Sequence, residues 1–328
     1  MKILFFGAGV INTLYAWALS EAGNDVSLYV RAEKETAWEN GIKLDILSER
    51  FGRKKYVKGV FKPKVVTAFQ PTDGYELIIE SVKHYQTKEI LPLIAKNAGN
   101  ALVLFFNNNW DGLAFIKQHL PITQYVLGMP RAGGSIKDGV LDGAITKDVM
   151  LGNSICGKAA PENVIRIANE NLQKIAKMFE EAGIKPIFQE NMEHWYWAHL
   201  ASTVPWIAGS AKVRGFLPFA KNRKAISEAL KAGKECVEIV KARGVDVTRV
   251  QDLQLFLAPV WFSAFMTQLF IGGEVSMKIS TGHGAYAPAE LQKIYYDLVA
   301  TGKQFSVPTP ILDSYKTYVD DMSKIANE

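Results

Sequence analysis

Cysteine is almost absent from this 328-residue chain, which contains only Cys156 and Cys236. Two thiols so far apart in sequence cannot build a disulfide framework, and neither has neighbours at metal-ligand spacing. Four histidines also lack the partner spacing of a metal site, namely His84, His119, His194 and His283. We therefore predict reduced cysteines, no bound metal and a cytoplasmic location.

The chain also lacks a strong excess of charge of either sign. Its 38 Lys and Arg residues stand against 33 Asp and Glu residues, which gives a formal net charge of +5. This charge is too diffuse to predict nucleic-acid binding, although it weakly favours anionic small molecules. With 48% hydrophobic and 22% charged residues, the composition is that of a globular protein and excludes collagen-like, mucin-like and disordered classes.

Long uninterrupted apolar runs are missing as well. Residues 255–271 are apolar nearly all round, but Pro259 and three polar residues interrupt them and the stretch is short for a bilayer span. Core packing and a contact between two copies in a homodimer are the two interpretations of this stretch. Residues 3–10 share the apolar character of a secretory signal, but a single Lys precedes them and Gly7 and Gly9 interrupt them. We expect neither secretion nor a membrane partner.

The first half of the chain alternates short apolar runs with amphipathic stretches. This pattern is typical of strands joined by crossover helices, so it predicts a largely parallel, doubly wound, Rossmann-like α/β sheet. The predicted strands are 2–6, 25–30, 76–82, 101–106, 124–128 and 185–189, with helices between the first two strands and over 163–182. Residues 50–63 are basic and show no regular pattern. We expect an irregular surface segment there.

The strand patterns stop beyond residue 190. Helical patterns cover 195–204, 221–243, 253–270 and 288–302, and we expect Pro205 to bend or end the first of these helices. The change of class near Gln189 predicts two domains. Residues 1–189 would form a cofactor-binding α/β domain, and residues 190–328 an all-α domain for substrate binding and dimerisation.

The sharpest local motif is Gly7-Ala8-Gly9-Val10-Ile11-Asn12, which directly follows a predicted strand and opens a predicted helix. Gly7 would permit the tight turn, Gly9 would let a pyrophosphate approach the backbone, and the N–H groups of the helix start would bind its charge. Asn12 replaces the usual third Gly or Ala, so helix and strand pack further apart or its amide helps to hold a phosphate. A plain structural turn is the alternative, but the flanking elements fall where a dinucleotide fingerprint requires them. We predict that Gly7, Gly9, Val10, Ile11 and Asn12 bind a cofactor.

The end of the second predicted strand distinguishes the two nicotinamide cofactors. An acidic residue there binds the ribose 2′-hydroxyl of NAD(H), whereas an Arg accommodates the 2′-phosphate of NADP(H). This chain has Arg31 at that place, with Lys34 three positions later. NADP(H) is the predicted cofactor, and two solvated charges at a strand exit are the alternative.

Three later segments extend this pattern. Lys83 lies in Ser-Val-Lys-His-Tyr-Gln, Asn108 is the middle residue of an Asn triplet, and Glu290 precedes the Val-Pro-Thr-Pro sequence at 307–310. Together with the glycine loop and Arg31, these segments resemble the ketopantoate reductase family over nearly the whole chain. The resemblance implies that Lys83 and Asn108 lie near cofactor and substrate and that Glu290 binds the substrate. A surface Lys, a turn Asn and a helix-start charge are the respective alternatives.

The chain departs from the family in the first helix of its second half. The family has a W-x-K-L-x-x-x-N segment whose Lys donates the proton, whereas this chain has His199 at the Lys position and Thr203 at the Asn position. Ile207 stands where the family has a second Asn, and Ser276 is the nearest candidate for its substrate-binding Ser. The resemblance therefore supports cofactor binding more strongly than it supports the ketopantoate reaction itself.

His199 can take over the missing proton donor. Reduction of a 2-keto acid needs a proton for the alkoxide that develops on oxygen, and an imidazole with a pKa near ~6.5 can supply it near neutral pH. Trp195, His199 and Thr203 are four residues apart, so they share one helix face. A packed, hydrogen-bonded core histidine is the alternative interpretation.

The resulting hypothesis is an enzyme that uses NADPH to reduce a small 2-keto acid, 2-dehydropantoate or a relative. The catalytic residues would be His199, Glu290 and Lys83, and the substrate would also contact Asn108, Thr203 and Ser276. Two alternatives stay open. One is a non-catalytic NADP(H) sensor, because the Lys and both Asn residues of the helix are lost. The other is a reductase for a bulkier carbonyl substrate, because the second half is rich in Trp.

Overall fold

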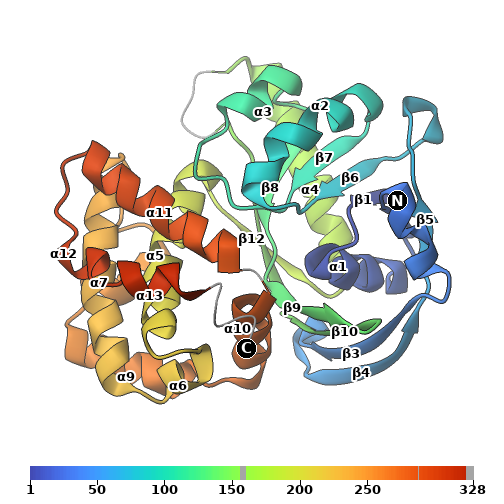
Figure 1. Ribbon diagram of the computed structural model, residues 1–328. Coiled ribbons are helices and arrows are strands. Elements are labelled where there is room, and N and C mark those ends of the chain that lie inside the picture. Colours follow the sequence, from blue (N-terminus) through green and yellow to red (C-terminus); the bar gives the residue numbers. More distant parts are fainter. Residues whose placement is uncertain (156–159, 287, 323–328) are drawn as a thin grey trace. The chain divides into compact units, whose positions relative to one another are not determined.

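The computed structural model describes residues 1–155, 160–286 and 288–322. The chain divides into two compact units, Met1–Glu193 and His194–Glu328 (Figure 1). Cys156 lies outside the described residues. The domain limits 1–189 and 190–328 stay predictions, and the first compact unit extends past the first of them to Glu193.

The first unit is built on an eight-stranded sheet of order β12-β11-β8-β7-β6-β1-β2-β5. Its strands are β1 (Lys2–Phe6), β2 (Asp25–Tyr29), β5 (Lys64–Val66), β6 (Leu77–Glu80), β7 (Leu102–Phe105), β8 (Tyr125–Met129), β11 (Asp148–Gly152) and β12 (Lys185–Phe188). All neighbours in the sheet are parallel except β8 and β11. Because β1 pairs with both β2 and β6, the direction of winding reverses at β1, and the predicted Rossmann-like fold is confirmed.

Apolar sequences produce the central strands. β1 reads Lys-Ile-Leu-Phe-Phe, β6 Leu-Ile-Ile-Glu and β7 Leu-Val-Leu-Phe, and every residue of the three except Lys2 is buried. Parallel strands need apolar residues on both faces because helices cover both. The helices α1 (Val10–Glu21) and α4 (Glu162–Glu181) share one core with these strands, while α2 (Thr87–Asn97) and α3 (Ala114–His119) lie on the other side of the sheet from α4 (Figure 1). Glu80 is the one charged residue buried in these three strands.

A second, four-stranded sheet of order β4-β3-β10-β9 corrects the predicted irregular segment at 50–63. Its strands are β3 (Ile42–Ser48), β4 (Lys55–Phe61), β9 (Ala132–Lys137) and β10 (Val140–Ile145). β4 is an edge strand in which even Tyr56 and Val60 are 62% and 56% exposed. With little burial on either face, β4 has no apolar alternation to read, and its lysines suit an edge that must not pair with another chain.

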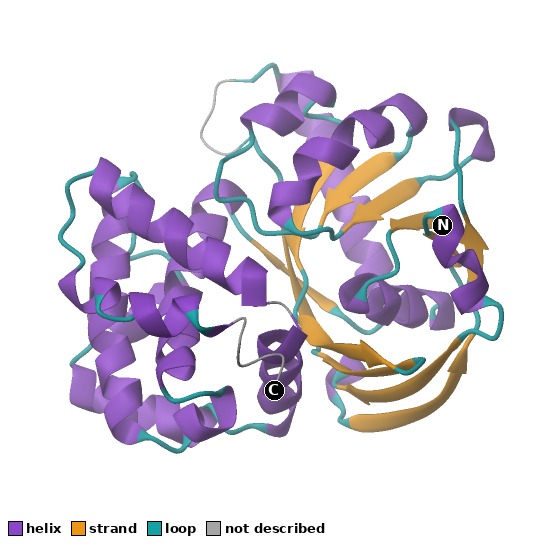
Figure 2. Cartoon of the chain, in the orientation of Figure 1, coloured by secondary structure: helices purple, strands orange, loops and turns teal. Residues whose placement is uncertain are grey.

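The described part of the second unit contains helices and no strand, so the all-α prediction is confirmed (Figure 2). Its α-helices are α5 (Met192–Lys212), which begins in the first unit, α6 (Phe216–Ala220), α7 (Arg223–Ala242), α8 (Gln254–Leu257), α9 (Val260–Phe270), α10 (Glu274–Tyr286), α11 (Pro288–Gln304), α12 (Pro310–Asp313) and α13 (Lys316–Asp320). A search of the described helices for one that could cross a bilayer found none.

Two prolines act differently from expectation. Of the two predicted effects of Pro205, a bend or an end of the helix, the end was wrong, because α5 continues to Lys212 with Pro205 inside it. A proline removes one helical hydrogen bond, but Val204 and Ala208 on either side are fully buried, and their packing offsets that loss. Pro259, by contrast, separates α8 from α9, so the single helix predicted over 253–270 was also wrong.

Candidate active site

The glycine loop forms the turn that its sequence predicts. Gly7 adopts a φ of +100°, which side-chain-bearing residues rarely adopt, and its N–H donates to the carbonyl of Tyr29 at 3.0 Å. α1 then begins at Val10 with Gly9 as its N-cap. The loop therefore connects the end of β1 to the start of α1 while remaining tied to β2.

Gly9 has no structural need to be a glycine. Its φ of −75° is open to any residue, and an added Cβ would meet no atom of the described residues within 4 Å. Gly9 offers no side chain to cap the helix, and the first turn of α1 carries no acidic residue. Since the first N–H groups of a helix have no intrahelical acceptor, they are available to an anion here.

Asn12 explains how the loop tolerates the loss of the third glycine. The side chain is 2% exposed, and its Nδ2 donates to the carbonyls of Phe6 and Gly7 at 2.9 Å each. Its Oδ1 accepts from the Ser81 hydroxyl at 2.8 Å. The amide therefore binds the protein's own backbone and joins the glycine loop to the segment after β6.

Arg31 follows β2 and is largely exposed, with 75% of its side chain accessible. Its Nε lies 3.2 Å from a carboxylate oxygen of Glu33. A guanidinium has five N–H donors in a planar fork, so this exposed pair leaves donors for a phosphate. Glu33 is nevertheless a competitor for the same group, and the sequence analysis did not consider it.

Lys83 and Asn108 follow β6 and β7, whose carboxyl ends meet the end of β1 at one edge of the sheet. Both residues are half-buried. The Asn108 Oδ1 is a buried atom with no hydrogen-bond partner in the described part of the chain. A buried polar oxygen without a donor is uncommon, and a ligand with an N–H or O–H group would satisfy it.

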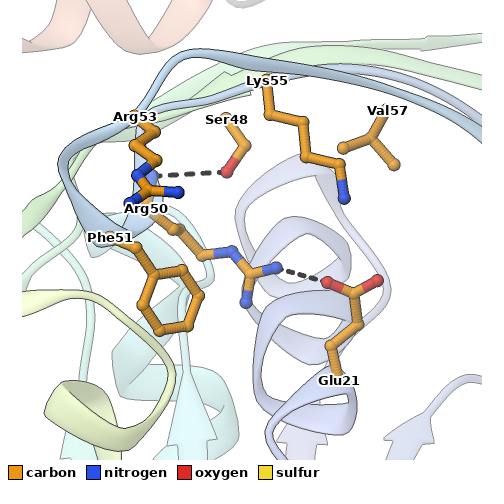
Figure 3. A pocket seen from close by; sticks show the side chains of 7 residues that line it. All are labelled: Glu21, Ser48, Arg50, Phe51, Arg53, Lys55 and Val57. Atoms are coloured by element: carbon orange, nitrogen blue, oxygen red, sulfur yellow. Dashed lines mark hydrogen bonds and ion pairs between the residues drawn. The ribbon is translucent and has the colours of Figure 1, made fainter.

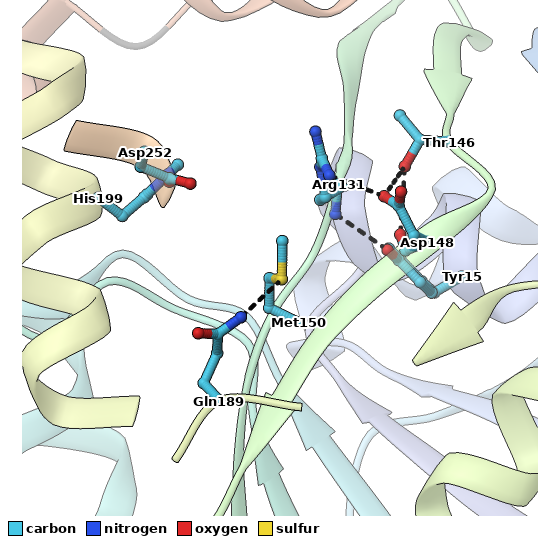
Figure 4. Close-up of polar contacts among 8 residues, drawn as sticks. All are labelled: Tyr15, Arg131, Thr146, Asp148, Met150, Gln189, His199 and Asp252. Atoms are coloured by element: carbon cyan, nitrogen blue, oxygen red, sulfur yellow. Dashed lines mark hydrogen bonds and ion pairs between the residues drawn. The ribbon is translucent and has the colours of Figure 1, made fainter. Parts of the chain in front are cut away.

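His199 has a carboxylate partner that the sequence analysis missed. Its Nδ1 lies 2.9 Å from Oδ2 of Asp252, between α7 and α8 (Figure 4). Its ring stacks on Trp195 at 4.8 Å between ring centres and 10° between planes. The four-residue spacing indicated the Trp195 contact, but Asp252 is 53 residues away in sequence and no local pattern marks it.

The remaining predicted residues of the second unit lie on three helices. The Thr203 hydroxyl donates to the His199 carbonyl at 2.8 Å, so the two share a segment of α5. Ser276 lies on α10 and is half-buried. Glu290 lies in the first turn of α11 and is also half-buried.

Two polar groups outside the predicted set stand out in the first unit. The Arg131 Nη1 lies 3.0 Å from Asp148, and its backbone N–H donates to the Tyr15 hydroxyl at 3.1 Å (Figure 4).

A cavity of about 470 Å³ is lined by Glu21, Ser48, Arg50, Phe51, Arg53, Lys55 and Val57 (Figure 3). The Nη atoms of Arg50 donate to structural partners there, namely the Glu21 carboxylate and the carbonyls of Ala18 and Ala182. The described residues include no cluster of His, Cys, Asp or Glu that could hold a metal ion.

The first unit fits a nicotinamide dinucleotide. The open helix start at Gly9 suits a pyrophosphate, the guanidinium at the end of β2 suits a ribose phosphate, and the free Asn108 oxygen suits a ligand donor. All three belong to the end of the sheet where α/β proteins bind their ligands.

Comparison with solved structures identifies the same two-part fold. D-mandelate dehydrogenase, solved with NADH and anilino(oxo)acetate, is 18% identical with a TM-score of 0.71, over 100% of this chain and 99% of the other. The 2-dehydropantoate 2-reductase of Geobacter metallireducens GS-15 is 16% identical with a TM-score of 0.69, over 98% and 99%. That of Methylococcus capsulatus is 20% identical with a TM-score of 0.68, over 100% and 99%.

A family model gives the more specific match. The model described as ketopantoate reductase PanE/ApbA matches residues 3–145, which include the glycine loop, Arg31, Lys83 and Asn108. The resemblance seen in these motifs is confirmed for this segment. Residues 3–145 of this chain thus match the ketopantoate reductase PanE/ApbA family.

Proposed function

We propose that this protein uses NADPH to reduce a small 2-keto acid, 2-dehydropantoate or a related acid. The observation that carries the proposal is Gly9, a glycine that neither backbone conformation nor packing requires, at the uncapped start of α1. A pyrophosphate lying against the backbone gives this glycine a function. The family of residues 3–145 and the fold shared with NADH-bound D-mandelate dehydrogenase support the same assignment.

The first unit would hold the cofactor. The N–H groups of Gly9, Val10 and Ile11 would bind the pyrophosphate, with Gly7 forming the turn and Asn12 fixing its shape. Arg31 would bind the 2′-phosphate, and Lys83 and Asn108 would reach the nicotinamide and the substrate. When bound, the nicotinamide supplies the hydride for the carbonyl carbon.

His199 would supply the proton. Because its Nδ1 lies against the Asp252 carboxylate, Nδ1 carries a proton and Nε2 is the atom left to face a substrate. Donation requires the imidazolium form, in which Nε2 also carries a proton; that proton would pass to the developing alkoxide oxygen and leave the neutral ring protonated at Nδ1. Glu290 would bind a substrate hydroxyl, and Thr203 and Ser276 would contact the rest of the acid.

The Gly9→Ala variant tests the cofactor site directly. The new methyl group meets nothing in the protein, so the melting temperature should stay within about 2 °C of wild type. The dissociation constant for NADPH, measured by fluorescence titration, should rise about 10-fold or more because a Cβ occupies the position of the pyrophosphate. Gly272→Ala is the matched control, since its Cβ also meets nothing. Equal NADPH binding by Gly9→Ala and wild type would contradict the proposal.

Substrate identity needs a separate experiment. A panel of 2-keto acids, including 2-dehydropantoate and an aryl 2-keto acid, would be assayed by NADPH consumption at about 340 nm with wild type and His199→Ala. The aryl acid is included because Trp195 stacks on His199, and because D-mandelate dehydrogenase shares the fold. Turnover lost in His199→Ala supports the reductase. Binding of NADPH with no turnover over the whole panel would favour the sensor instead.

We also propose that two copies associate through α9. Trp261, Phe262, Phe265, Leu269 and Phe270 on this helix are 43–70% exposed. Exposed apolar surface of this extent on one helix is unusual for a monomer. The core interpretation of residues 255–271 holds only for the opposite face, where Ser263, Ala264 and Thr267 are buried.

A further inference from the structure

The end of β6 carries a buried carboxyl group that the proposed mechanism does not use. Glu80 is 0% exposed and lies between β1 and β7, in register with Phe6 and Phe105. No cation of the described residues makes an ion pair with it. A carboxyl group in the centre of a parallel sheet is costly to bury unless its oxygens are hydrogen-bonded, so the hydrogen-bond partners of Glu80 indicate what it does.

Both carboxyl oxygens of Glu80 accept hydrogen bonds, and each donor belongs to a different loop. Oε1 accepts from the backbone N–H of Val82 at 3.0 Å. Oε2 accepts from the Nδ2 of Asn107 at 2.8 Å. Val82 directly precedes Lys83, and Asn107 directly precedes Asn108. One side chain therefore fixes the position of the two segments that carry both of these predicted site residues.

Neighbouring contacts extend this connection on both sides. The Asn107 Nδ2 also donates to the Thr87 hydroxyl at 2.8 Å, at the start of α2. On the other side, Ser81 donates to Asn12 in the glycine loop at 2.8 Å. Residues 80 and 81 thus link the glycine loop, the Lys83 segment and the Asn triplet, which come from three separate parts of the sequence.

We propose that Glu80 and Asn107 form a positioning pair, which holds Lys83 and Asn108 in the geometry that binds the nicotinamide end of the cofactor. This inference rests on the proposed function, because it assumes that these two residues contact the cofactor. The pair touches neither cofactor nor substrate itself. It acts through Val82 and through the backbone of the Asn triplet.

The donor and acceptor roles in the Glu80–Asn107 pair can be exchanged by substitution. In Glu80→Gln, an NH₂ group replaces one carboxyl oxygen and meets the Asn107 NH₂ group, so two donors face each other. Adding Asn107→Asp restores a donor opposite an acceptor, and the Thr87 hydroxyl can rotate to donate to the new carboxylate. The double variant therefore rebuilds the contact with its direction reversed, without changing the size of either side chain.

NADPH titration and steady-state kinetics on the full chain test the proposal. Glu80→Gln should remain folded by circular dichroism, while its dissociation constant for NADPH rises about 10-fold and its kcat falls. The double variant should recover most of the affinity. Ser27→Ala is the control, since the Ser27 hydroxyl is buried in β2 and has no hydrogen-bond partner among residues 1–155, 160–286 and 288–322, and this variant should bind NADPH like wild type. Rescue by the exchange would not follow from a merely structural role.

The outcomes separate this inference from the proposed function. If wild type does not bind NADPH, the proposed function fails. If wild type binds NADPH and Glu80→Gln binds it equally well, or if the folded double variant stays as weak as the single one, the positioning pair is wrong. Should Glu80→Gln not fold, Asn107→Ala removes the Nδ2 donor of the pair and leaves Glu80 in place. Unchanged affinity in that variant would overturn the proposal as well.

Discussion

The Nδ1 of His199 lies 2.9 Å from the carboxylate of Asp252, on a ring that stacks against Trp195. A His that a carboxylate holds at one nitrogen and an indole holds at its face has a fixed tautomer and a fixed orientation. This arrangement differs from an ordinary packed core histidine, because about a third of the side chain, 32%, remains exposed. The geometry suits a proton donor.

Asp252→Asn should lower kcat by about 10-fold to 100-fold, because the amide no longer favours the Nδ1-protonated tautomer of His199. NADPH affinity should not change, since Asp252 belongs to the second unit. Combining Asp252→Asn with His199→Ala should lower kcat no further than His199→Ala alone. Additive losses in the two kcat values would show that Asp252 acts independently of His199.

Arg31→Ala should weaken NADPH binding by about 1 to 3 kcal/mol while leaving NADH binding nearly unchanged, because only NADPH carries the phosphate that a guanidinium binds. Glu33→Gln should act in the opposite direction, since it releases the Arg31 guanidinium from its carboxylate partner. Fluorescence titrations with both cofactors measure these effects. A similar loss for NADH and NADPH in Arg31→Ala would contradict a role in phosphate recognition.

Glu80 should make the folded state less stable as the pH rises. Burial raises the pKa of its carboxyl from 4.5 to about 8. Between these values the unfolded chain has released a proton that the folded protein still binds, so the free energy of unfolding falls as pH rises from about 4.5 to about 8. The free energy of unfolding, measured with urea across this pH range, should fall less steeply with pH in Glu80→Gln than in wild type.

Glu76→Gln is the control for this slope. Hydrogen bonds from the Lys2 N–H and the Lys174 side chain lower the pKa of Glu76, so its titration falls below the measured range. Its removal should leave the pH dependence between about 5 and 8 as in wild type. The same slope in wild type and Glu80→Gln would show that Glu80 does not titrate in this interval.

Phe265→Glu should convert a dimer into monomers, because it places a carboxylate on the exposed apolar face of α9, where Phe265 is 48% exposed. Light scattering during size-exclusion chromatography measures the mass. Tyr56→Glu is the matched control, since Tyr56 is 62% exposed on β4 in the first unit. A wild-type mass of one chain, or a dimer that persists in Phe265→Glu, would refute association through α9.

Sequence patterns predicted six of the eight strands of the large sheet, but not β5 or the buried strand β11. The central strands are apolar throughout, and α4 shows a clear amphipathic period, so both were found to within a residue or two. The sheet of β3, β4, β9 and β10 was not found. Its exposed edge strand, β4, carries Tyr and Lys rather than an alternating apolar pattern. The paired strands β3 and β10 of this sheet are separated by about a hundred residues of chain.

Some residues of the candidate site could likewise be predicted from the sequence, and others could not. Gly7, Gly9 and Arg31 could be proposed because a single stretch of chain contains the turn, the helix start and the next strand. Asp252 and Glu80 could not be found, because their importance comes from contacts with His199 and Asn107, which lie 53 and 27 residues away. A carboxylate acquires such a role only when the fold brings its partner to it.

Arg50 joins the last turns of two helices, through the carbonyls of Ala18 in α1 and Ala182 after α4, to the connection between β3 and β4. A hairpin held in this way can detach from the sheet core only by breaking these hydrogen bonds and the ion pair of Arg50 with Glu21. The β4 amide protons that bond to β3 should consequently exchange with deuterium only when the whole first unit opens, although β4 itself faces the solvent. An exposed edge strand would then report on the global opening of the unit to which it belongs.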